Sequence, residues 1–208
     1  APCQATKYHI DSQKQFDALS TATFLPGDVV LFKKGQRFSG MFSPSGRGKV
    51  DAAIRIDTYG QGSRPRIDVG GKNIAGLLLQ NVAYWEVNGL EITNTDGTGE
   101  DQGQLFGIYV VVKGVEGVYQ HVHVNDCYIH DVNGLVAGKK RGGIHVHVQD
   151  CESTIFHDLR ITNNRIVRVG GVGIGNMSSC GRIEFREHDT ISHNLWTKVY
   201  VAGNFIDQ

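Results

Sequence analysis

Three segments of the sequence repeat one pattern, and this repeat limits the fold more than any other feature. Residues 84–94 read YWEVNGLEITN, residues 121–131 read HVHVNDCYIHD, and residues 158–168 read DLRITNNRIVR. Each contains an alternating strand, a short polar turn and a second alternating strand, and residues 198–208 begin a fourth copy. A unit of this size buries its hydrophobic face only against its neighbours, so the pattern predicts units stacked along one axis.

Alignment of the segments predicts columns of equivalent residues. One inward column contains Val87, Val124, Ile161 and Val201, and the next contains Leu90, Cys127, Asn164 and Asn204. Successive members of the first column are 37, 37 and 40 residues apart. Asn164 and Asn204 would form a ladder of side-chain hydrogen bonds at the tight turn.

A third strand follows in each unit, after a loop that contains glycine. These strands are expected at residues 107–112, 143–148 and 173–178. Antiparallel hairpins would need tight turns after most strands, whereas here short and long connections recur in a fixed order. The sequence therefore predicts an all-β fold, a parallel β-helix with three strands in each coil.

The N-terminal third is less regular and would close one end of the stack. Residues 12–22 (SQKQFDALSTA) predict an amphipathic capping helix with Phe16 and Leu19 on one face. Strands are expected at residues 29–32 and 53–59. A turn is expected at residues 35–40.

The far end of the stack is expected to be uncapped. A bare last coil exposes its hydrophobic cross-section, and no helix or covering loop follows the last repeat. We therefore expect residues 1–208 to form a single β-helix domain that is the N-terminal part of a longer β-helix. The remaining coils would be lost or present as a separate chain.

Charge and composition exclude several classes of protein. The 21 basic and 21 acidic residues cancel, which disfavours a nucleic-acid partner or another general polyanion. The longest apolar runs fall far short of the roughly 20 residues of a membrane span. The 27 glycines and only 4 prolines suit many short strands with tight turns. A first residue other than Met suggests processing, and we expect a secreted or periplasmic protein.

The four cysteines show no CxxC pair, so no structural metal is expected. Cys151 and Cys180 would sit at nearly the same point of successive coils. A disulfide between them and two free thiols both remain open.

Four motifs resemble the right-handed parallel β-helix proteins of the pectate-lyase-like superfamily. They are PGDVVLFKKG at 26–35, IDTYG at 56–60, EVNGLEITN at 86–94 and YIHDV at 128–132. The resemblance is to the large secreted bacterial members that degrade plant or algal polysaccharides. It implies a carbohydrate-active enzyme, either a glycoside hydrolase or a polysaccharide lyase, and leaves open a non-catalytic carbohydrate-binding or adhesin β-helix.

The resemblance also implies that the cleft follows the third strand of each coil. There His145 and His147 would point outward, beside Tyr109 of the preceding coil. The predicted catalytic residues are His145, His147, Asp101 and Asp150, and the predicted substrate-binding residues are Tyr109, Lys139, Lys140 and Arg141.

These side chains contain the groups needed for either hydrolysis or β-elimination. A hydrolase needs two carboxyl groups, whereas a lyase needs a cation and a base such as histidine. Hydrolysis of a polysaccharide or oligosaccharide is slightly preferred, because no dense track of Arg and Lys suits a polyuronate. No cofactor is required, although a Ca²⁺ site built from loop acids is left open without any EF-hand-like spacing.

The first strands present two further outward columns. One contains Glu86, His123, Arg160 and Tyr200, and the other contains Tyr84, His121, Asp158 and Lys198. Acid beside histidine suggests parts of a catalytic triad, but alternating charge also stabilises a sheet face through cross-strand pairs. The structural interpretation is preferred, because no GxSxG-like nucleophile accompanies them.

Overall fold

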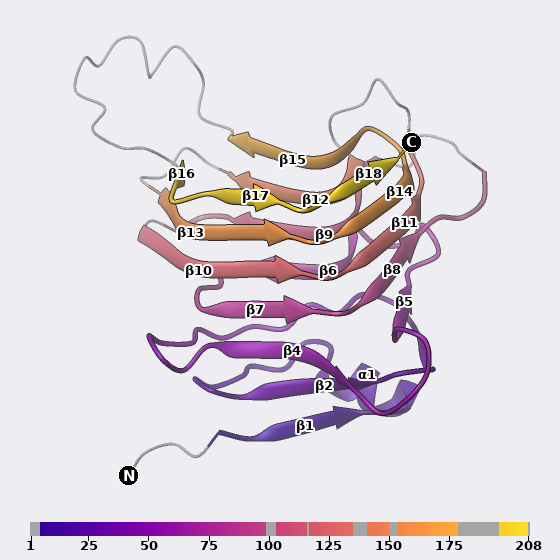
Figure 1. The fold of residues 1–208 in the computed structure, drawn as a ribbon, viewed down its shortest axis with the longest axis horizontal. Coiled ribbons are helices and arrows are strands. Elements are labelled where there is room, and N and C mark those ends of the chain that lie inside the picture. The colour runs from indigo at the N-terminus through magenta and orange to yellow at the C-terminus, as the bar shows by residue number, and fades with distance from the viewer. Residues whose placement is uncertain are drawn as a thin grey trace.

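A computed structural model describes residues 5–98, 103–115, 117–134, 141–149, 154–178 and 196–207. Strands predominate, and every named strand pairs with its neighbours in parallel, in three sheets. The strands stack one above another from the N-terminal to the C-terminal end of the chain (Figure 1). Within the described residues, no helix is both long and apolar enough to cross a bilayer.

Successive passages of the chain add strands to each of three sheets. Sheet 1 contains β1 (Lys7–Ile10), β2 (Val29–Lys33), β4 (Ile54–Tyr59), β7 (Trp85–Asn88), β10 (Gly117–Asn125), β13 (Thr154–Thr162), β16 (Trp196–Thr197) and β17 (Tyr200–Ala202). Sheet 2 contains β3 (Arg37–Ser39), β5 (Arg66–Asp68), β8 (Glu91–Asn94), β11 (Tyr128–Val132), β14 (Arg165–Val169) and β18 (Phe205–Asp207). Sheet 3 contains β6 (Ala75–Gln80), β9 (Leu105–Val112), β12 (Arg141–Val148) and β15 (Val172–Ser178). From β4 onward the chain visits sheets 1, 2 and 3 in that order, and one such passage is called a coil below.

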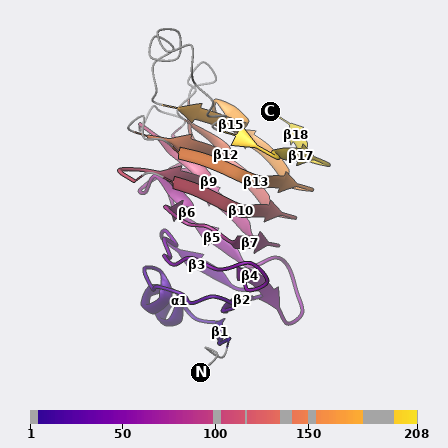
Figure 2. The ribbon, with the colours of Figure 1, turned by 90° about the vertical axis from the view of Figure 1, so that its left-hand side faces the viewer.

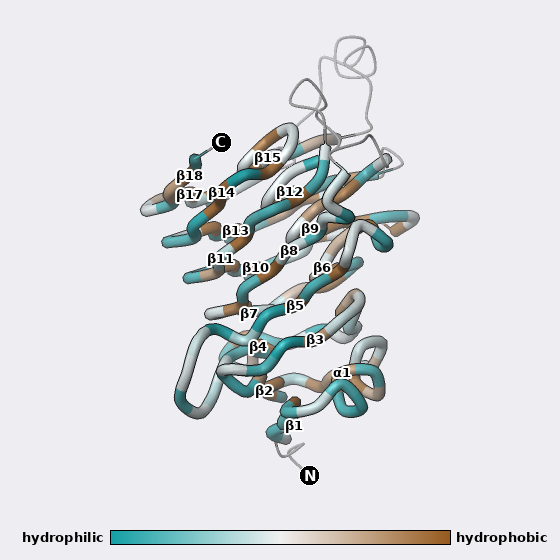
Figure 3. The backbone as a smooth tube through the Cα atoms, turned by 90° about the vertical axis from the view of Figure 1, so that its right-hand side faces the viewer, coloured by the Kyte–Doolittle hydropathy of each residue, from teal (hydrophilic) through white to brown (hydrophobic). Residues whose placement is uncertain are grey.

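The predicted inward column of sheet 1 is confirmed. Val124 pairs with Val87 on one side and with Ile161 on the other, and Ile161 pairs with Val201. The first three of these side chains are at most 2% exposed and belong to one core that runs along the stack. Hydrophilic and hydrophobic residues alternate along strands of sheets 1 and 2, as the tube in Figure 3 shows. This alternation directs one side chain in two toward the core.

The asparagine ladder is also confirmed. Asn164 is 1% exposed, and its Oδ1 accepts a hydrogen bond of 2.9 Å from the backbone N–H of Cys127. Its Nδ2 donates to the Val124 carbonyl oxygen and to Asn204 Oδ1, at 3.1 and 3.0 Å. Asn204 repeats the arrangement one coil later, where its Nδ2 donates to the carbonyl oxygen of Ile161. Each side chain therefore joins two coils at the tight turn between sheets 1 and 2.

A column of glycines forms the corner between sheets 2 and 3. A Cβ atom added to Gly143 would lie 2.6 Å from Cγ2 of Ile166 and 2.7 Å from the carbonyl oxygen of Gly173. The same close approach to an isoleucine occurs for Gly76 with Ile92, Gly107 with Ile129 and Gly173 with Ile206. Only a residue without Cβ fits these positions, because the isoleucine fills the space.

The N-terminal segment contains the predicted helix in a shorter form. Helix α1 (Gln13–Leu19) begins after the N-cap Ser12, which forms a capping box with Gln15. It lies at the N-terminal end of the stack, beside β1 and β2 (Figure 2). Phe16 is buried and stacks on Phe38 at 5.4 Å between ring centroids.

The expected turn at residues 35–40 is wrong in one respect, because β3 lies within it and pairs with β5. The strands expected at 29–32 and 53–59 correspond to β2 and β4. The sequence interpretation assigned no strand at β1, β5 or β6. Cys127 is a buried free thiol, whereas Cys151 and Cys180 lie outside the described residues.

Candidate functional site

The outer face of sheet 3 carries the histidines predicted from the sequence. His145 pairs with Tyr109 of the preceding coil, and His147 pairs with Val111. The Tyr109 hydroxyl is 2.7 Å from Nδ1 of His147. The ring of Phe106 stacks on Tyr109 and on His145, at centroid distances of 4.6 and 4.7 Å. We call Phe106, Tyr109, His145 and His147 the aromatic–histidine cluster.

The expectation of an exposed cleft face at these residues is wrong. Tyr109, His145 and His147 are only 2%, 2% and 3% exposed, and Arg141 is 5% exposed. Phe106 and Tyr109 pack into a second hydrophobic cluster, separate from the core on the inner face of the sheet. Sheet 3 is therefore buried on both faces in this part of the chain. Stacked rings cover one another, which alternation along the strand does not reveal.

Four predicted site residues lie outside the described residues. They are Asp101, Asp150, Lys139 and Lys140. Of the predicted residues that the structure describes, it brings together Tyr109, His145 and His147 in one cluster. Phe106 joins them, and the sequence interpretation did not select it. Its signal was an aromatic residue immediately before the strand predicted at 107–112, which in the structure begins already at Leu105.

His145 has an unusual environment. Among the described residues neither of its ring nitrogens has a hydrogen-bond partner, although the side chain is buried. Burial, with a smaller contribution from His147, lowers the pKa of His145 to about 4. The ring has room because the next coil places Gly175 beside it, where an added Cβ would lie 2.9 Å from its Nδ1. Burial also raises the pKa of Tyr109 to about 12, so its hydroxyl keeps its proton near neutral pH.

We expect His145 to make the protein less stable in weak acid. In the unfolded chain its pKa is about 6.5, so only the unfolded state takes up this proton between about pH 6.5 and 4. The free energy of unfolding is therefore highest above about pH 6.5, as far as His145 determines it. It decreases by up to about 3 kcal/mol as the pH falls toward 4. Denaturant unfolding of the wild type and His145→Phe at several pH values measures this loss.

The phenylalanine variant keeps a ring on Phe106 and should lose this part of the pH dependence. His9→Phe, which removes an exposed imidazole from β1, is the matched control and should keep it. Parallel pH profiles for the wild type and His145→Phe would contradict the assignment.

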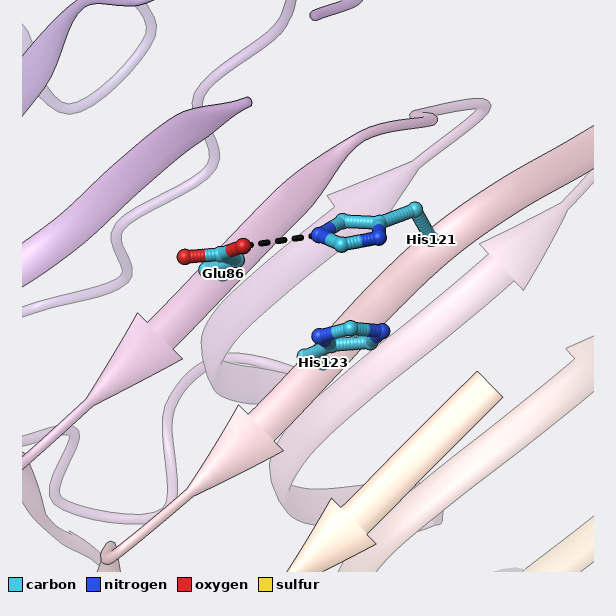
Figure 4. Close-up of side chains that lie close together, drawn as sticks. All are labelled: Glu86, His121 and His123. Atoms are coloured by element: carbon cyan, nitrogen blue, oxygen red, sulfur yellow. Dashed lines mark hydrogen bonds and ion pairs between the residues drawn. The ribbon is translucent and has the colours of Figure 1, made fainter. Parts of the chain in front are cut away.

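The outer face of sheet 1 carries a second polar group of residues. Nε2 of His121 is 2.7 Å from a Glu86 oxygen, and its Nδ1 is 3.1 Å from Asp158 Oδ2. The same Asp158 oxygen is 3.0 Å from Nε2 of His123. Figure 4 shows Glu86 facing His121, with His123 beside it on β10. We call Glu86, His121, His123 and Asp158 the acid–histidine cluster.

A repeated backbone kink brings these side chains together. Tyr84, His121, Asp158 and Lys198 all have left-handed backbone conformations, with φ of 57°, 54°, 59° and 52°. In β10 the ladder passes from Gln120 to Val122 with no paired position at His121. The kink interrupts the alternation of the strand, so that His121 and His123 lie with ring centroids 3.8 Å apart.

The predicted outward column of Glu86, His123 and Arg160 is confirmed by the strand register. Burial raises the pKa of Asp158, but hydrogen bonds from Arg160 and His123 outweigh it, and the pKa is lowered overall. Burial lowers the pKa of His123, which the hydrogen bond to Asp158 offsets only in part. The cluster therefore holds an ionised Asp158 carboxylate beside a His123 imidazole whose neutral form is favoured.

Two surface hollows adjoin this cluster. One, of about 660 Å³, is lined by Tyr84, Glu86 and His121 together with residues of the loop before β4. The other, of about 250 Å³, is lined by Tyr84, His121, Asp158 and Arg160 among others. Solvent and small ions can reach the cluster from both. Glu86 and Asp158 are unsuited to act as the two carboxyl groups of a hydrolase, because the ring of His121 lies between them.

Comparisons with known proteins identify structures with a similar fold but no protein family. No protein-family model matches the chain, and no curated protein matches it. Solved structures do match, among them the GH136 lacto-N-biosidase from Eubacterium ramulus as native protein and as selenomethionine derivative. Each has a TM-score of 0.74 at 19% sequence identity over 97% of this chain. The chain spans 41% of the length of that enzyme, and the likeness concerns the fold.

Proposed function

We propose that the chain is part of a right-handed parallel β-helix of the pectate-lyase-like superfamily, in an enzyme that hydrolyses glycosidic bonds. The three parallel sheets and their fixed order along the chain support the β-helix. The fold likeness to a lacto-N-biosidase favours glycoside hydrolysis over β-elimination. Its substrates would be plant or algal polysaccharides, as the sequence motifs imply, or lacto-N-biosides, as the neighbour's name implies. A secreted or periplasmic location is proposed on the same resemblance.

The observation that carries the proposal is the unpartnered imidazole of His145 within the aromatic–histidine cluster. A buried polar group without a partner costs about 1–3 kcal/mol, and such groups occur where a ligand or water supplies the partner. Sugar hydroxyls both donate and accept hydrogen bonds, and aromatic rings such as Phe106 pack on their apolar faces. We therefore propose that sugar binds along sheet 3, where Tyr109 and His147 are hydrogen-bonded beside His145. Because these side chains are at most 3% exposed, the proposal requires the groups that bury them to move when sugar binds.

The acid and base are proposed from the sequence. Asp101 precedes β9 in the chain and Asp150 follows β12, so both belong to connections that flank sheet 3. A hydrolase requires two carboxyl groups about 5 to 9.5 Å apart. β9 begins and β12 ends at opposite ends of sheet 3, and their eight residues span roughly 26 Å. Asp101 and Asp150 are therefore each proposed as a catalytic carboxyl group, but not as the two members of one pair. Lys139, Lys140 and Arg141 are the proposed substrate-binding residues.

Digestion of a glycan panel by the protein expressed from its complete coding sequence tests this function. The panel contains plant and algal polysaccharides and a chromogenic lacto-N-bioside. New reducing ends or free chromophore, without absorbance from unsaturated uronates, are expected. Unsaturated products would instead show a lyase. Retention on immobilised glycan without any product would show a binding protein.

Variants test the proposed face. We expect His145→Ala and Tyr109→Phe each to lower kcat/KM at least about tenfold, because one lost hydrogen bond to a sugar is worth on the order of 1.4 kcal/mol. His9→Ala on β1 is the control and should keep full activity. Full activity of both variants, with thermal unfolding unchanged, would remove sheet 3 from the site.

A further inference from the structure

We propose that Glu86, His121 and His123 bind a divalent transition-metal ion of the Zn²⁺ class on the outer face of sheet 1. Each residue offers one ligand atom, and these atoms all lie within 4.8 Å of one another. In a tetrahedral zinc site the bonds are about 2.0–2.2 Å, which places ligand atoms roughly 3.4 Å apart. Small side-chain rotations therefore bring the three donors onto one ion. Two imidazoles and a carboxylate suit Zn²⁺ and similar metals, whereas Ca²⁺ takes oxygen ligands.

Asp158 supplies the support that metal-binding histidines usually have. Such a histidine donates its other ring N–H to a carboxylate, which fixes its tautomer and orientation. In His121, Nε2 faces Glu86 while Nδ1 faces Asp158 at 3.1 Å. The second Asp158 oxygen accepts from Nε of Arg160 at 2.7 Å. Asp158 is thus held in place as an orienting group and need not leave its arginine to bind the metal.

The carboxylate of Glu86 is available to bind a metal ion. Among the described residues no lysine or arginine forms an ion pair with Glu86. The side chains of Glu86, His121 and His123 are 32%, 28% and 17% exposed, so an ion can enter and keep a water ligand. Glu86 and His121 also line the hollow of about 660 Å³.

A similar group on sheet 2 shows what the proposed site has in addition. His130 lies between Glu91 and Asp131, with nitrogen–oxygen distances of 3.1 and 2.5 Å. Its side chain is only 8% exposed, and no second imidazole joins it among the described residues. Arginines occupy both carboxylates, since Arg66 lies 3.7 Å from Glu91 and Arg168 lies 2.7 Å from Asp131. This group is a salt-bridge network and provides a matched control.

The proposed ion would join two coils. Glu86 belongs to β7 and both histidines belong to β10, so one ion would connect strands from consecutive coils. It would stabilise the folded state by mass action, because the unfolded chain does not hold the three donors together. The site lies on sheet 1, apart from the face proposed for sugars, and its test does not depend on any glycosidase activity.

Metal titration of untagged protein after chelator treatment tests the site. We compare the wild type with Glu86→Gln, His123→Ala and the control His130→Ala, using Zn²⁺, Co²⁺ and Ca²⁺ as probes. The Co²⁺ absorption difference between the wild type and Glu86→Gln isolates this site from any other metal-binding group. We expect His123→Ala to weaken Zn²⁺ binding here at least about 100-fold, and Zn²⁺ to raise the melting temperature of the wild type until chelator is added.

Glu86→Gln is nearly isosteric and should fold, so it separates loss of a ligand from loss of structure. The Co²⁺ absorption of His130→Ala should differ from that of Glu86→Gln as the wild-type absorption does. Any Ca²⁺ binding should be the same in the wild type and in Glu86→Gln. The proposal is overturned if Glu86→Gln and His123→Ala bind Zn²⁺ and Co²⁺ as the wild type does. It is equally overturned if His130→Ala loses the signal as fully as they do.

Discussion

Gly143→Ala is expected to lower the free energy of unfolding by about 3 kcal/mol, the upper range for a methyl group forced into a packed core. The new Cβ would lie 2.6 Å from Cγ2 of Ile166 and 2.7 Å from the Gly173 carbonyl oxygen. The oxygen belongs to the backbone of the next coil, so a side-chain rotation alone cannot relieve both contacts. Denaturant unfolding at neutral pH measures the change.

A second substitution separates this steric effect from a general cost of replacing glycine. Ile166→Ala removes the atom in contact, so the double variant should be less destabilised than the sum of the two single variants. Gly70→Ala is the control, because an added Cβ there meets nothing within 4 Å and only its φ of 67° opposes alanine. It should cost about 1 kcal/mol. Additive losses in the double variant would argue against contact with Ile166.

Asn164→Ala is the second substitution with a large expected effect, about 3 kcal/mol of unfolding free energy, because it leaves buried backbone groups without partners. The N–H of Cys127 and the carbonyl oxygen of Val124 would each lose the hydrogen bond that Asn164 supplies. The side-chain hydrogen bond to Asn204 in the next coil would also be lost, whereas the backbone N–H of residue 164 would still donate to Asn204 Oδ1. Denaturant unfolding gives the free energy, and amide hydrogen exchange at Cys127 should accelerate in the variant.

The neighbouring turn residue provides the control for this prediction. Asn163 is exposed and has a left-handed φ of 56°, which glycine adopts without strain. Asn163→Gly should therefore change stability by no more than about 0.5 kcal/mol. Equal losses for Asn163→Gly and Asn164→Ala would assign the effect to the turn as a whole.

Periodicity predicted the columns because inward residues recur at nearly constant separation, as Val87, Val124 and Ile161 do. Strands of three residues, such as β3, are too short to show alternation. Strand β6 (Ala75–Gln80) is a single apolar run without alternation, because this part of sheet 3 is buried on both faces.

The sites were harder to predict than the strands. Alternation correctly directed His145 and His147 outward, but the burial of an outward face depends on packing between coils, which no single strand specifies. The sequence interpretation of the acid–histidine cluster was a ladder of alternating charges. The columns of charged residues can be read from the sequence, whereas the backbone kink that brings them together cannot. Left-handed backbone is normally expected at glycine, whereas here Tyr84, His121 and Asp158 adopt it. Stacking on the same kink in the adjacent coil holds each of them in place.

The glycine corner and the stacked turns have a consequence for how such a molecule can change its length. Positions 37 residues apart, such as Val87 and Val124, already lie one above the other. Gain or loss of one whole coil would join chain ends that are neighbours in space and would keep every column in phase. The structure can thus grow or shrink in modular steps of about 4.8 Å, whereas shorter insertions would be confined to the connections between sheets.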